Sequence, residues 1–528
     1  MLLFLSDFRP RPKPSSWERS LGPADRRLQP LLCTTTAAMP LCRAAAAATR
    51  RSTRRAVQSL GRRFSTAISS SPGSLSVALS LQDYAIERNT VRHGHSPRVC
   101  SSAEEAMEPY LQSDGMVFIH AGAATPQPLM QGMINVAKAK KLRNLQTIHM
   151  HLEGPGPIPL DDPEAAECIR PLPTFVGANL RKQVMTGDAE AIPIHLRDLP
   201  YLFRRRVVRP DVALLHCSPP DAHGFCTLGT SVDWARGAAE HSKALVALIN
   251  PQMPRVHGDG IIHFSQFDAV LHHDGPLWIH KTKELSKEEV SIGQHIANLV
   301  PDGATLQMGI GSVPDAALSQ LTNHKNLGIH TEMFSDGVLP LIESGVVNNS
   351  MKSTYRGRTI SAFLSGSQKL YDFVNDNLSV NLKDVAYTNN VEVIASQQSM
   401  IGINSCIEMD MTGQAASSTI GFRIYSGFGG QVDFLTGAAA SQNGKGILAF
   451  PSRTHKGVPR IVPQLNEGAA VVTTRAQVQW VVTEYGSVNL FGKSLPQRAR
   501  SLISLAHPDD RDDLERHAHE RFGKAFPK

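Results

Sequence analysis

One carboxylate stands alone in an apolar stretch of the sequence. Residues 327–337 read LGIHTEMFSDG, and Glu332 lies there among Leu327, Ile329 and Met333. The apolar residues predict the end of a buried strand that runs into a helix. A carboxylate in such surroundings has a raised pKa unless something holds its charge, and carboxylates can act as nucleophiles that form covalent intermediates. A helix N-cap or a salt bridge explains an isolated Glu as well, and the residues alone do not decide between these readings.

A loop with two glycines follows another predicted strand. Residues 309–314 read GIGSVP and lie between an apolar run and a predicted helix. Clustered glycines let backbone N–H groups approach a ligand, and the N-terminus of a helix favours anionic groups. A tight turn that binds nothing fits the same residues. The dinucleotide fingerprint GxGxxG is not met, because Pro314 occupies the place of the last glycine.

A denser glycine cluster lies at residues 426–434, which read SGFGGQVDF. Gly427, Gly429 and Gly430 indicate backbone conformations that other residues do not hold, or amides that are presented to a negatively charged oxygen. Donors of this kind form oxyanion sites. A glycine bulge within a strand is an equally good interpretation of this segment by itself.

Two parts of the chain follow the same pattern. Each has a predicted helix, an Asp-Gly turn, an apolar run and a loop with glycine, and in each a proline follows the aspartate by twelve residues. The pairs are Asp114 with Pro126 and Asp302 with Pro314. Agreement in order, turn and spacing predicts two related α/β domains with a boundary near Leu285.

The remaining apolar runs fit parallel strands that are buried on both faces. They are Val212–His216, Ala244–Ile249, Val391–Ala395, Ile447–Phe450 and Ala470–Thr473. The predicted fold class is therefore α/β, with two related open-sheet domains at 85–285 and 286–528. Ligands of such sheets collect at the loops beyond the carboxyl ends of the strands, so chemistry is expected there. The stretch 494–521 is rich in charged residues and predicts a solvated surface helix.

The net charge of +7 comes from the first part of the chain. Residues 1–64 hold 13 Lys and Arg against three acids, which leaves 41 basic and 44 acidic residues in the rest. A nucleic-acid-binding surface on the body of the protein loses its main support. Because 1–64 is rich in Arg and Ser and poor in acids, it predicts a mitochondrial transit peptide, with a linker at 65–84 and location in the matrix. A disordered basic tail is the alternative.

Cysteine spacing and hydropathy argue against a cysteine metal site and against a membrane-spanning helix. Of the seven cysteines, five follow the leader: Cys100, Cys168, Cys217, Cys226 and Cys406. They form no CxxC pair and no metal-ligand spacing, so buried thiols are expected and no metal site. No run of the sequence reaches 18 uncharged apolar residues, so no membrane-spanning helix is predicted.

Several motifs together resemble the acetyl-CoA hydrolase/4-hydroxybutyrate CoA-transferase family, the family I CoA-transferases. They are the Thr331-Glu332-Met333 triplet, the GIGSVP loop, the cluster from Gly427 to Phe434 and the segment 481–508, VVTEYGSVNLFGKSLPQRARSLISLAHP. Asn250–Arg255 and Pro210–Leu214 agree as well. The resemblance spans roughly residues 85–525 in the family's order. It is therefore more specific than any single loop.

The resemblance implies roles for individual residues. Glu332 is the implied nucleophile in a cleft between the two domains, and the loop Gly309, Ile310, Gly311, Ser312 and Val313 is implied to bind CoA. Gly430 lies in the cluster whose amides would hold the thioester oxygen, together with Gly427 and Gly429. Gln307 and His120 would line the acyl-carboxylate pocket, and Asn404 would lie on the CoA side. For His120, a hydrogen-bonded core histidine is nearly as good an interpretation.

The implied activity is transfer of CoA between an acyl-CoA, acetyl-CoA in the first place, and a carboxylic acid such as succinate. It would proceed through an acyl-glutamyl anhydride and a glutamyl-CoA thioester, with CoA esters as substrates, no permanent cofactor and a homodimeric assembly. An acyl-CoA hydrolase of the same family is the close alternative. A nucleotide-dependent oxidoreductase is a distant one, because the third glycine and an acid for the ribose are missing.

Overall fold

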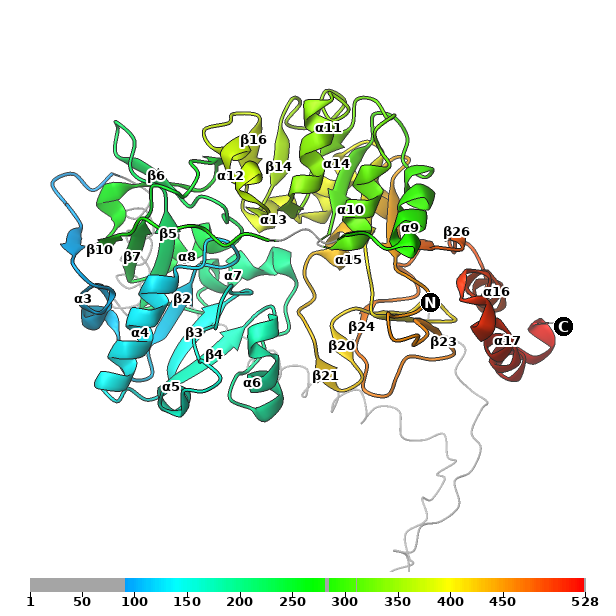
Figure 1. Cartoon of the computed structure of the whole chain (residues 1–528), viewed down its shortest axis with the longest axis horizontal. Coiled ribbons are helices and arrows are strands. Elements are labelled where there is room, and N and C mark those ends of the chain that lie inside the picture. The colour runs from blue at the N-terminus through cyan, green and yellow to red at the C-terminus, as the bar shows by residue number, and fades with distance from the viewer. Residues whose placement is uncertain (1–90, 281–283, 310, 527–528) are drawn as a thin grey trace, which may run out of the picture. The chain divides into compact units, whose positions relative to one another are not determined.

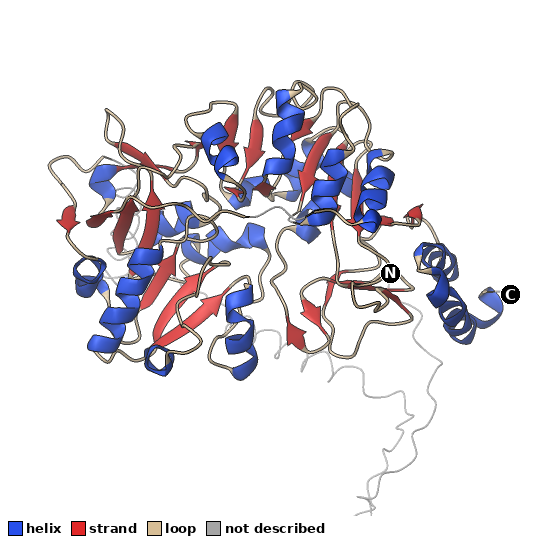
Figure 2. Ribbon diagram, viewed as in Figure 1, coloured by secondary structure: helices blue, strands red, loops and turns tan. Residues whose placement is uncertain are grey.

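The computed structural model describes residues 91–280, 284–309 and 311–526. The predicted transit peptide 1–64, the linker 65–84 and Ile310 lie outside these residues. Two open sheets organise the described chain, one built from its first half and one from its second (Figure 1). Helices and strands alternate along both halves, as Figure 2 shows. The predicted α/β class is confirmed.

The first sheet has seven strands, and all of its pairings are parallel. In spatial order the strands are β1 (Arg98–Cys100), β10 (Ala269–His272), β7 (Ala244–Ile249), β5 (Val212–Cys217), β2 (Met116–Ile119), β3 (Leu145–His149) and β4 (Ile169–Pro173). Every residue of β5 and β7 is buried. These two strands confirm the expectation of apolar runs that are covered on both faces.

The second sheet has six strands, of which only the last pairs in the antiparallel sense. In spatial order they are β12 (Gly328–Ile329), β11 (Thr305–Met308), β17 (Met400–Asn404), β22 (Lys445–Ala449), β25 (Trp480–Thr483) and β26 (Gly486–Asn489). Every residue of β11 and β17 is buried. The predicted strand Ile447–Phe450 corresponds to β22.

The two sheets wind in the same order. In the first, β2 has β3 on one side and β5, β7 and β10 on the other; in the second, β11 has β12 on one side and β17, β22 and β25 on the other. An Asp-Gly turn precedes β2 and β11 alike, with positive φ at Asp114 (58°) in one and at Gly303 (75°) in the other. The repeat that predicted two related α/β halves therefore corresponds to the same strand order in both.

Helices connect the strands. In the first half they are α3 (Ala103–Met107), α4 (Gln127–Ala139), α5 (Pro163–Cys168), α6 (Arg181–Thr186), α7 (Leu199–Arg204) and α8 (Ala235–His241). In the second half they are α9 (Lys287–Ala297), α10 (Ser312–Ser319), α11 (Leu339–Glu343), α12 (Gln368–Val374), α13 (Val385–Thr388), α14 (Val391–Ser396), α15 (Gln431–Ala440), α16 (Leu495–Leu505) and α17 (Pro508–Phe522). Helix α9 packs on α10, and α14 packs on α15.

Five smaller sheets accompany the two large ones in the described residues, four of them with strands of the second half and one within the first. They are formed by β13 (Met333–Phe334) with β15 (Phe363–Leu364); by β14 (Thr359–Ser361), β16 (Val380–Leu382) and β8 (His257–Gly258); by β23 (Ile461–Val462), β18 (Glu408–Asp410), β19 (Ala415–Ala416) and β24 (Val471–Thr473); by β20 (Thr419–Ile420) with β21 (Arg423–Ile424); and, in the first half, by β6 (Phe225–Thr227) with β9 (Ile261–His263). The predicted strand Ala470–Thr473 is thus real, but β24 pairs antiparallel to β19 and does not belong to a parallel sheet.

The prediction of a strand at Val391–Ala395 was wrong, because these residues form helix α14. The side chain of Asn390 accepts hydrogen bonds from the N–H groups of Glu392 and Val393 and so caps the helix. A short apolar run has no periodicity that separates a buried helix from a strand.

The charged stretch 494–521 is less solvated than predicted. It forms α16 and α17, and α16 buries Ala499 and Leu502 completely. Arg498 is also buried and donates through Nη1 to the carbonyl oxygen of Arg475 at 2.7 Å. A charge-rich composition therefore concealed a helix with one face in the core.

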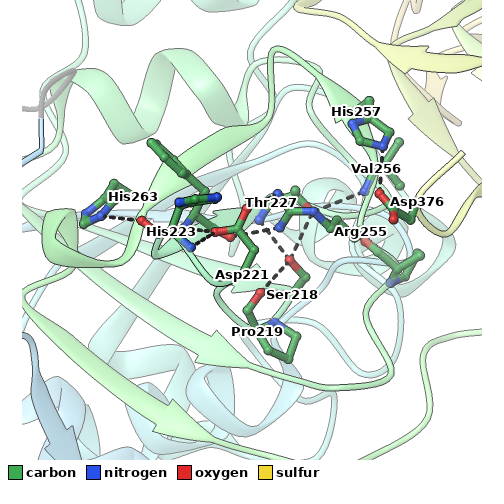
Figure 3. A network of polar contacts seen from close by, with 12 residues as sticks. Ser218, Pro219, Asp221, His223, Thr227, Arg255, Val256, His257, His263 and Asp376 are labelled. Carbon is green, nitrogen blue, oxygen red and sulfur yellow. Dashed lines mark hydrogen bonds and ion pairs between the residues drawn. The ribbon is translucent and has the colours of Figure 1, made fainter. Parts of the chain in front are cut away.

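A polar network ties the segment between β7 and β9 to the second half (Figure 3). Arg255 pairs with Asp221 at 2.7 Å, and the N–H of Asp376 donates to the carbonyl oxygen of Arg255, also at 2.7 Å. The ring of His257 contacts the carboxylate of Asp376 at 3.0 Å. Strand β8 then pairs with β16, so a segment of the first half completes a sheet of the second.

Two further expectations concern cysteines and membranes. Cys100, Cys168, Cys217, Cys226 and Cys406 are all free and buried, as predicted. Among the described residues no helix combines the length and the hydropathy that crossing a bilayer requires.

Candidate active site

Glu332 lies in the short break between β12 and β13. Its carbonyl oxygen accepts hydrogen bonds from the N–H groups of Ala362 (2.9 Å) and Phe363 (3.2 Å). The chain continues through β13 into the 3-10 turn η5 (Asp336–Val338) and helix α11. The predicted strand that runs into a helix is therefore present, and its backbone holds Glu332 in a fixed position.

The carboxylate of Glu332 is held by neutral donors. Oε2 accepts a hydrogen bond from the side-chain amide of Asn389 at 2.8 Å, and the backbone N–H of Gly430 also donates to the carboxylate. No ion pair within the described residues includes Glu332, and it caps no helix there. Glu332 therefore forms neither the salt bridge nor the helix N-cap that could have explained an isolated Glu.

Burial decides the charge of this side chain. The pKa of Glu332 is raised to about 7: desolvation raises it most, the hydrogen bonds from Asn389 and Gly430 lower it, and the buried carboxylate of Asp233 raises it by a smaller amount. The side chain nevertheless keeps part of its surface accessible. A carboxylate with this pKa is ionised above neutral pH and carries little hydration.

The dense glycine cluster is a turn that leads into helix α15, not a bulge in a strand. Gly429 has a φ of +58°, and Gly430 is the N-cap residue of α15. A Cβ on Gly430 would lie 2.0 Å from Oε2 of Glu332 and 2.3 Å from Nδ2 of Asn389. Only glycine fits at this position, so that its N–H reaches the carboxylate.

The same cluster contacts the first half of the chain. A Cβ on Gly427 would lie 2.8 Å from the carbonyl oxygen of Thr174 and 2.9 Å from the ring of Phe175. Phe175 also lies 3.9 Å from the Cβ position of Gly429, which is itself 3.9 Å from Oε1 of Glu332. The nucleophile candidate therefore lies where the two halves meet, and a cleft at this place stays a prediction.

Gln307 and Asn404 form a buried pair at the ends of adjacent strands. Nδ2 of Asn404 donates to Oε1 of Gln307 at 3.0 Å. One residue further along β11, the N–H of Met308 donates to the hydroxyl of Thr331 at 3.2 Å, and this hydroxyl donates back to the Met308 carbonyl at 3.1 Å. The strand that carries Gln307 is thereby tied to the residue before Glu332.

The loop that follows β11 reaches a large cavity. Gly311, with a φ of +123°, is the N-cap residue of α10, and Ser312 donates a hydrogen bond to the carboxylate of Glu289 in α9. Gly311, Ser312 and Val313 line a cavity of about 1040 Å³. Ile310 lies outside the described residues, and Gly309 donates its N–H to the carbonyl of Ile403 at 3.2 Å.

Glu332 is not among the residues that line this cavity, but neighbours of the site are. Ser405 follows Asn404 directly, and Tyr425 lies two residues before Gly427. The wall also carries the cationic side chains of Lys287, Arg453 and Arg460. The cavity therefore borders the same strand ends and the same glycine turn that surround the carboxylate.

His120 has the geometry of a core histidine. It is fully buried, its Nε2 lies 2.6 Å from the carbonyl oxygen of Ser231, and its Nδ1 accepts the N–H of His216 at 3.2 Å. Burial lowers its pKa to about 4, so the ring is neutral. Both ring nitrogens are engaged within the first half, and its place in an acyl pocket stays a prediction.

Several residues at the site were not found from the sequence. Asn389 lies 57 positions after Glu332, and the hydroxyl of Thr388 donates to its Oδ1 at 3.0 Å, which fixes the orientation of the amide. Arg197 reaches Asp433 from 236 positions away. Only Asp433 had a local signal, since it belongs to the glycine-rich motif.

Comparison with known proteins shows the family of the chain. The family model described as "Acetyl-CoA hydrolase/transferase N-terminal domain" matches residues 86–277, and the one described as "Acetyl-CoA hydrolase/transferase C-terminal domain" matches residues 366–518. Among solved structures, RipA from Yersinia pestis superposes with a TM-score of 0.76 at 32% identity, over 80% of this chain and 98% of that chain.

Two relatives are similar over nearly their whole length. A succinyl-CoA:acetate/propanoyl-CoA:succinate CoA transferase of Fasciola hepatica is 48% identical over 437 residues, which are 82% of this chain and 90% of the relative. A 4-hydroxybutyrate coenzyme A transferase of Clostridium kluyveri is 42% identical over 422 residues, 80% of this chain and 97% of the relative. With both halves matched and the site assembled at their seam, the chain belongs to the acetyl-CoA hydrolase/transferase family.

Proposed function

We propose that this protein is an acyl-CoA:carboxylate CoA-transferase that works through a covalent intermediate on Glu332. One observation carries the proposal: a desolvated carboxylate, without a cationic partner among the described residues, receives hydrogen bonds from Asn389 and Gly430 at the seam of the two halves. Such a group is a poorly hydrated nucleophile, and N–H groups beside it can donate hydrogen bonds to the oxygen on which negative charge develops.

In the first half-reaction an oxygen of the Glu332 carboxylate attacks the thioester carbonyl of the acyl-CoA. The negative charge moves to the carbonyl oxygen, where backbone N–H donors of the glycine turn stabilise it. The C–S bond then breaks, and CoA leaves as thiolate from an acyl-glutamyl anhydride. The thiolate attacks the Glu332 carbonyl, which releases the first acid as its carboxylate and leaves a glutamyl-CoA thioester.

The second half-reaction reverses these steps with another acid. Its carboxylate attacks the glutamyl-CoA thioester and expels CoA thiolate, which then attacks the acyl carbonyl of the new anhydride. A new acyl-CoA leaves and the Glu332 carboxylate is restored. No net proton transfer is needed, so the task of the protein is to position the groups and exclude water.

The cavity beside α10 supports the binding of CoA. Its volume of about 1040 Å³ lies at the upper end of the usual range for ligand sites, about 300–1,000 Å³. Lys287 and Arg460 offer positive charge to phosphate groups, whereas Arg453 is paired with Asp509 and Asp510. The loop at Gly311 offers backbone amides. We place the nucleotide part of CoA there and its thioester end toward Glu332.

The relatives support short-chain acids as substrates. The Fasciola hepatica protein is named for acetate, propanoyl and succinate groups, and we propose acetyl-CoA or propanoyl-CoA with succinate for this chain. Acetyl-CoA hydrolase is the second candidate in the family. The acetyl-CoA hydrolase of Kluyveromyces lactis aligns over only 43% of this chain and 42% of its own length, at 32% identity, which favours the transferase.

One experiment separates the two activities. Acetyl-CoA is incubated with the protein, with and without succinate, and the products are separated. A transferase forms succinyl-CoA only when succinate is present, with ping-pong kinetics. Release of free CoA at a rate that ignores succinate would instead support a hydrolase.

A second experiment tests the covalent step. The protein is incubated with acetyl-CoA, treated with borohydride or digested directly, and analysed by mass spectrometry. We expect a CoA adduct, or its reduction product, on the peptide that contains Glu332, and none in Glu332→Ala. An unmodified peptide in a fully active protein would exclude the proposed intermediate.

Three further proposals come from the composition of residues 1–64 and from the family resemblance. We propose the mitochondrial matrix as the location, a homodimer as the assembly and no resident cofactor beyond CoA esters. The described residues contain no cluster of three His, Cys, Asp or Glu that could hold a metal ion. A fluorescent fusion, light scattering of the purified protein and elemental analysis test these points in turn.

A further inference from the structure

The ring of His330 makes a second contact between the segment that carries Glu332 and the end of helix α13. His330 is fully buried, and its Nε2 lies 2.8 Å from the carbonyl oxygen of Thr388, the last residue of α13. The residue after Thr388 is Asn389, whose side-chain amide donates to Glu332. Two residues of one segment, His330 and Glu332, therefore bind two consecutive residues of another.

The acceptor determines which nitrogen of the ring carries the hydrogen. A carbonyl oxygen cannot donate, so Nε2 of His330 carries the hydrogen and donates it to Thr388. Nδ1 is buried and has no hydrogen-bond partner among the described residues. Burial lowers the pKa of His330 to about 3, and the nearby side chain of Lys352 lowers it as well, so the ring is neutral. His330 is therefore a fixed donor of one side-chain hydrogen bond.

The carbonyl group that His330 binds belongs to a helix end. The last carbonyl groups of a helix have no partner within the helix, and α13 ends at Thr388. On the other side of the same peptide, the N–H of Asn389 donates to the carbonyl oxygen of Val385 at 2.9 Å. Both polar groups of the peptide that joins Thr388 to Asn389 are thus hydrogen-bonded. The orientation of this peptide sets the direction in which the Asn389 side chain leaves the backbone.

Two further hydrogen bonds connect this peptide with the carboxylate. The hydroxyl of Thr388 donates to Oδ1 of Asn389 at 3.0 Å, which leaves Nδ2 to donate to Oε2 of Glu332 at 2.8 Å. The backbone of His330 is itself fixed, because its N–H donates to the carbonyl oxygen of Leu306 in β11 at 3.0 Å. Every step from the ring of His330 to the carboxylate is therefore a hydrogen bond or a covalent bond.

The ring also packs against two aromatic side chains. Its centroid lies 6.2 Å from that of Tyr387 and 6.4 Å from that of Phe434. Phe434 belongs to α15, the helix whose N-cap residue is Gly430, so a change of volume at position 330 could reach the second donor of Glu332 through packing. The effect of the hydrogen bond is therefore separated from that of packing only when the volume at this position is held constant.

We propose that His330 is a positioning residue for the reaction: through its hydrogen bond to the Thr388 carbonyl, it fixes the peptide from which Asn389 reaches the Glu332 carboxylate. The inference rests on the proposed role of Glu332 as nucleophile. The attacking oxygen needs a defined direction toward the thioester carbonyl, and a carboxylate held from a fixed peptide keeps that direction. Loss of the ring donor slows the attack and leaves acyl-CoA binding unchanged, since His330 lines no part of the cavity beside α10.

His330→Gln and His330→Met form a matched pair of variants. Their side chains are similar in length and volume, but only glutamine has an N–H donor that can take the place of Nε2. Both are mixed with acetyl-CoA at a temperature at which circular dichroism shows them folded, and mass spectrometry follows the CoA adduct on the Glu332 peptide. One neutral hydrogen bond corresponds to about five- to tenfold in rate, so the adduct should form more slowly in His330→Met than in His330→Gln by that factor.

The dependence on acetyl-CoA concentration separates positioning from binding. We expect the maximal rate of adduct formation to differ between the two variants, and the concentration that gives half of this rate to be the same. Equal maximal rates in His330→Gln and His330→Met would show that the ring donor is not used, and the proposal would fail.

The same pair in the Asn389→Ala background tests the route of the effect. There the peptide at Thr388 has no side-chain amide to direct, so we expect His330→Gln and His330→Met to form the adduct at one rate. An undiminished difference in this background would mean that His330 acts independently of Asn389, which contradicts the proposal. Where Asn389→Ala forms no adduct over several hours, the pair in the wild-type background alone decides.

Failure of this inference is distinguishable from failure of the proposed function. An active wild type that carries no adduct on the Glu332 peptide defeats the proposed function and this inference with it. An adduct that forms in the wild type, but at one rate in His330→Gln and His330→Met, defeats only the role of His330.

Discussion

Exchange of Glu332 for glutamine should stabilise the protein at alkaline pH while it abolishes transfer. Asn389 donates to Oε2, and the N–H of Gly430 donates to the same carboxylate. A glutamine carbonyl oxygen can take the place of Oε2, with its amide nitrogen where Oε1 lies. Glu332→Gln therefore keeps the hydrogen bond from Asn389 and removes the charge.

The magnitude follows from the pKa. In the folded state the pKa of Glu332 is raised from 4.5 to about 7, so folding takes up a proton in this interval and the charged form opposes the fold. Stability falls as the pH rises from 4.5 through 7, and the full difference corresponds to about 3 kcal/mol. Glutamine does not titrate, so we expect the gain of Glu332→Gln to be below about 1 kcal/mol at pH 5 and about 3 kcal/mol at pH 8.

Urea unfolding at pH 5 and pH 8 measures this difference. The midpoints of wild type and Glu332→Gln are compared at each pH, with slopes fitted separately because two halves can unfold in more than one step. Glu515→Gln in α17 is the matched control, since Glu515 is exposed and the same charge is removed. We expect its effect to be small at both pH values.

One result would refute the reasoning. If Glu332→Gln changes stability equally at pH 5 and pH 8, the carboxylate carries no desolvated charge in the folded protein. The nucleophile would then be as well hydrated as a surface acid, and the physical basis of its reactivity would be lost.

Two substitutions test the groups that hold Glu332. Gly430→Ala places a methyl group 2.0 Å from Oε2, so we expect at least a 100-fold loss of kcat/KM without loss of fold, measured by steady-state kinetics and circular dichroism; near-normal kinetics would show that the reaction does not need the Glu332 carboxylate in this position. Thr388→Val removes the hydroxyl that orients the Asn389 amide, which should destabilise the protein by about 1 kcal/mol and reduce kcat, whereas Thr388→Ser should retain kcat in the same assay; equal losses in both would assign the effect to packing.

Local patterns in the sequence were sufficient for the architecture. The spacing of Asp114 with Pro126 and of Asp302 with Pro314 marks two strands that occupy the same place in two sheets of the same strand order. Such features are readable because a turn, an apolar run and a loop are set by neighbouring residues. The unusual setting of Glu332 could be recognised for the same reason.

Short apolar segments were less informative. Val391–Ala395 reads as a strand but forms α14, because the cap at Asn390 and the packing against α15 select the helix. His120 follows β2, which occupies the same place in its sheet as β11, the strand that holds Gln307. The two ring nitrogens of His120 are nevertheless engaged by Ser231 and His216. The periodicity of apolar residues predicts which face of an element is buried, but not which groups the polar residues on that face will contact.

The sequence by itself determined the class of fold, the two related halves and the position of the acid on which the chemistry is proposed to occur. Only the tertiary structure decided which groups hold that acid: Asn389 from 57 residues away, and the N–H of Gly430 at the start of α15. The physical reason is that hydrogen bonds and charges in a buried seam act over a few ångströms in space, whatever the separation along the chain. Which residues come within that range depends on how two sheets, each encoded locally, pack against one another.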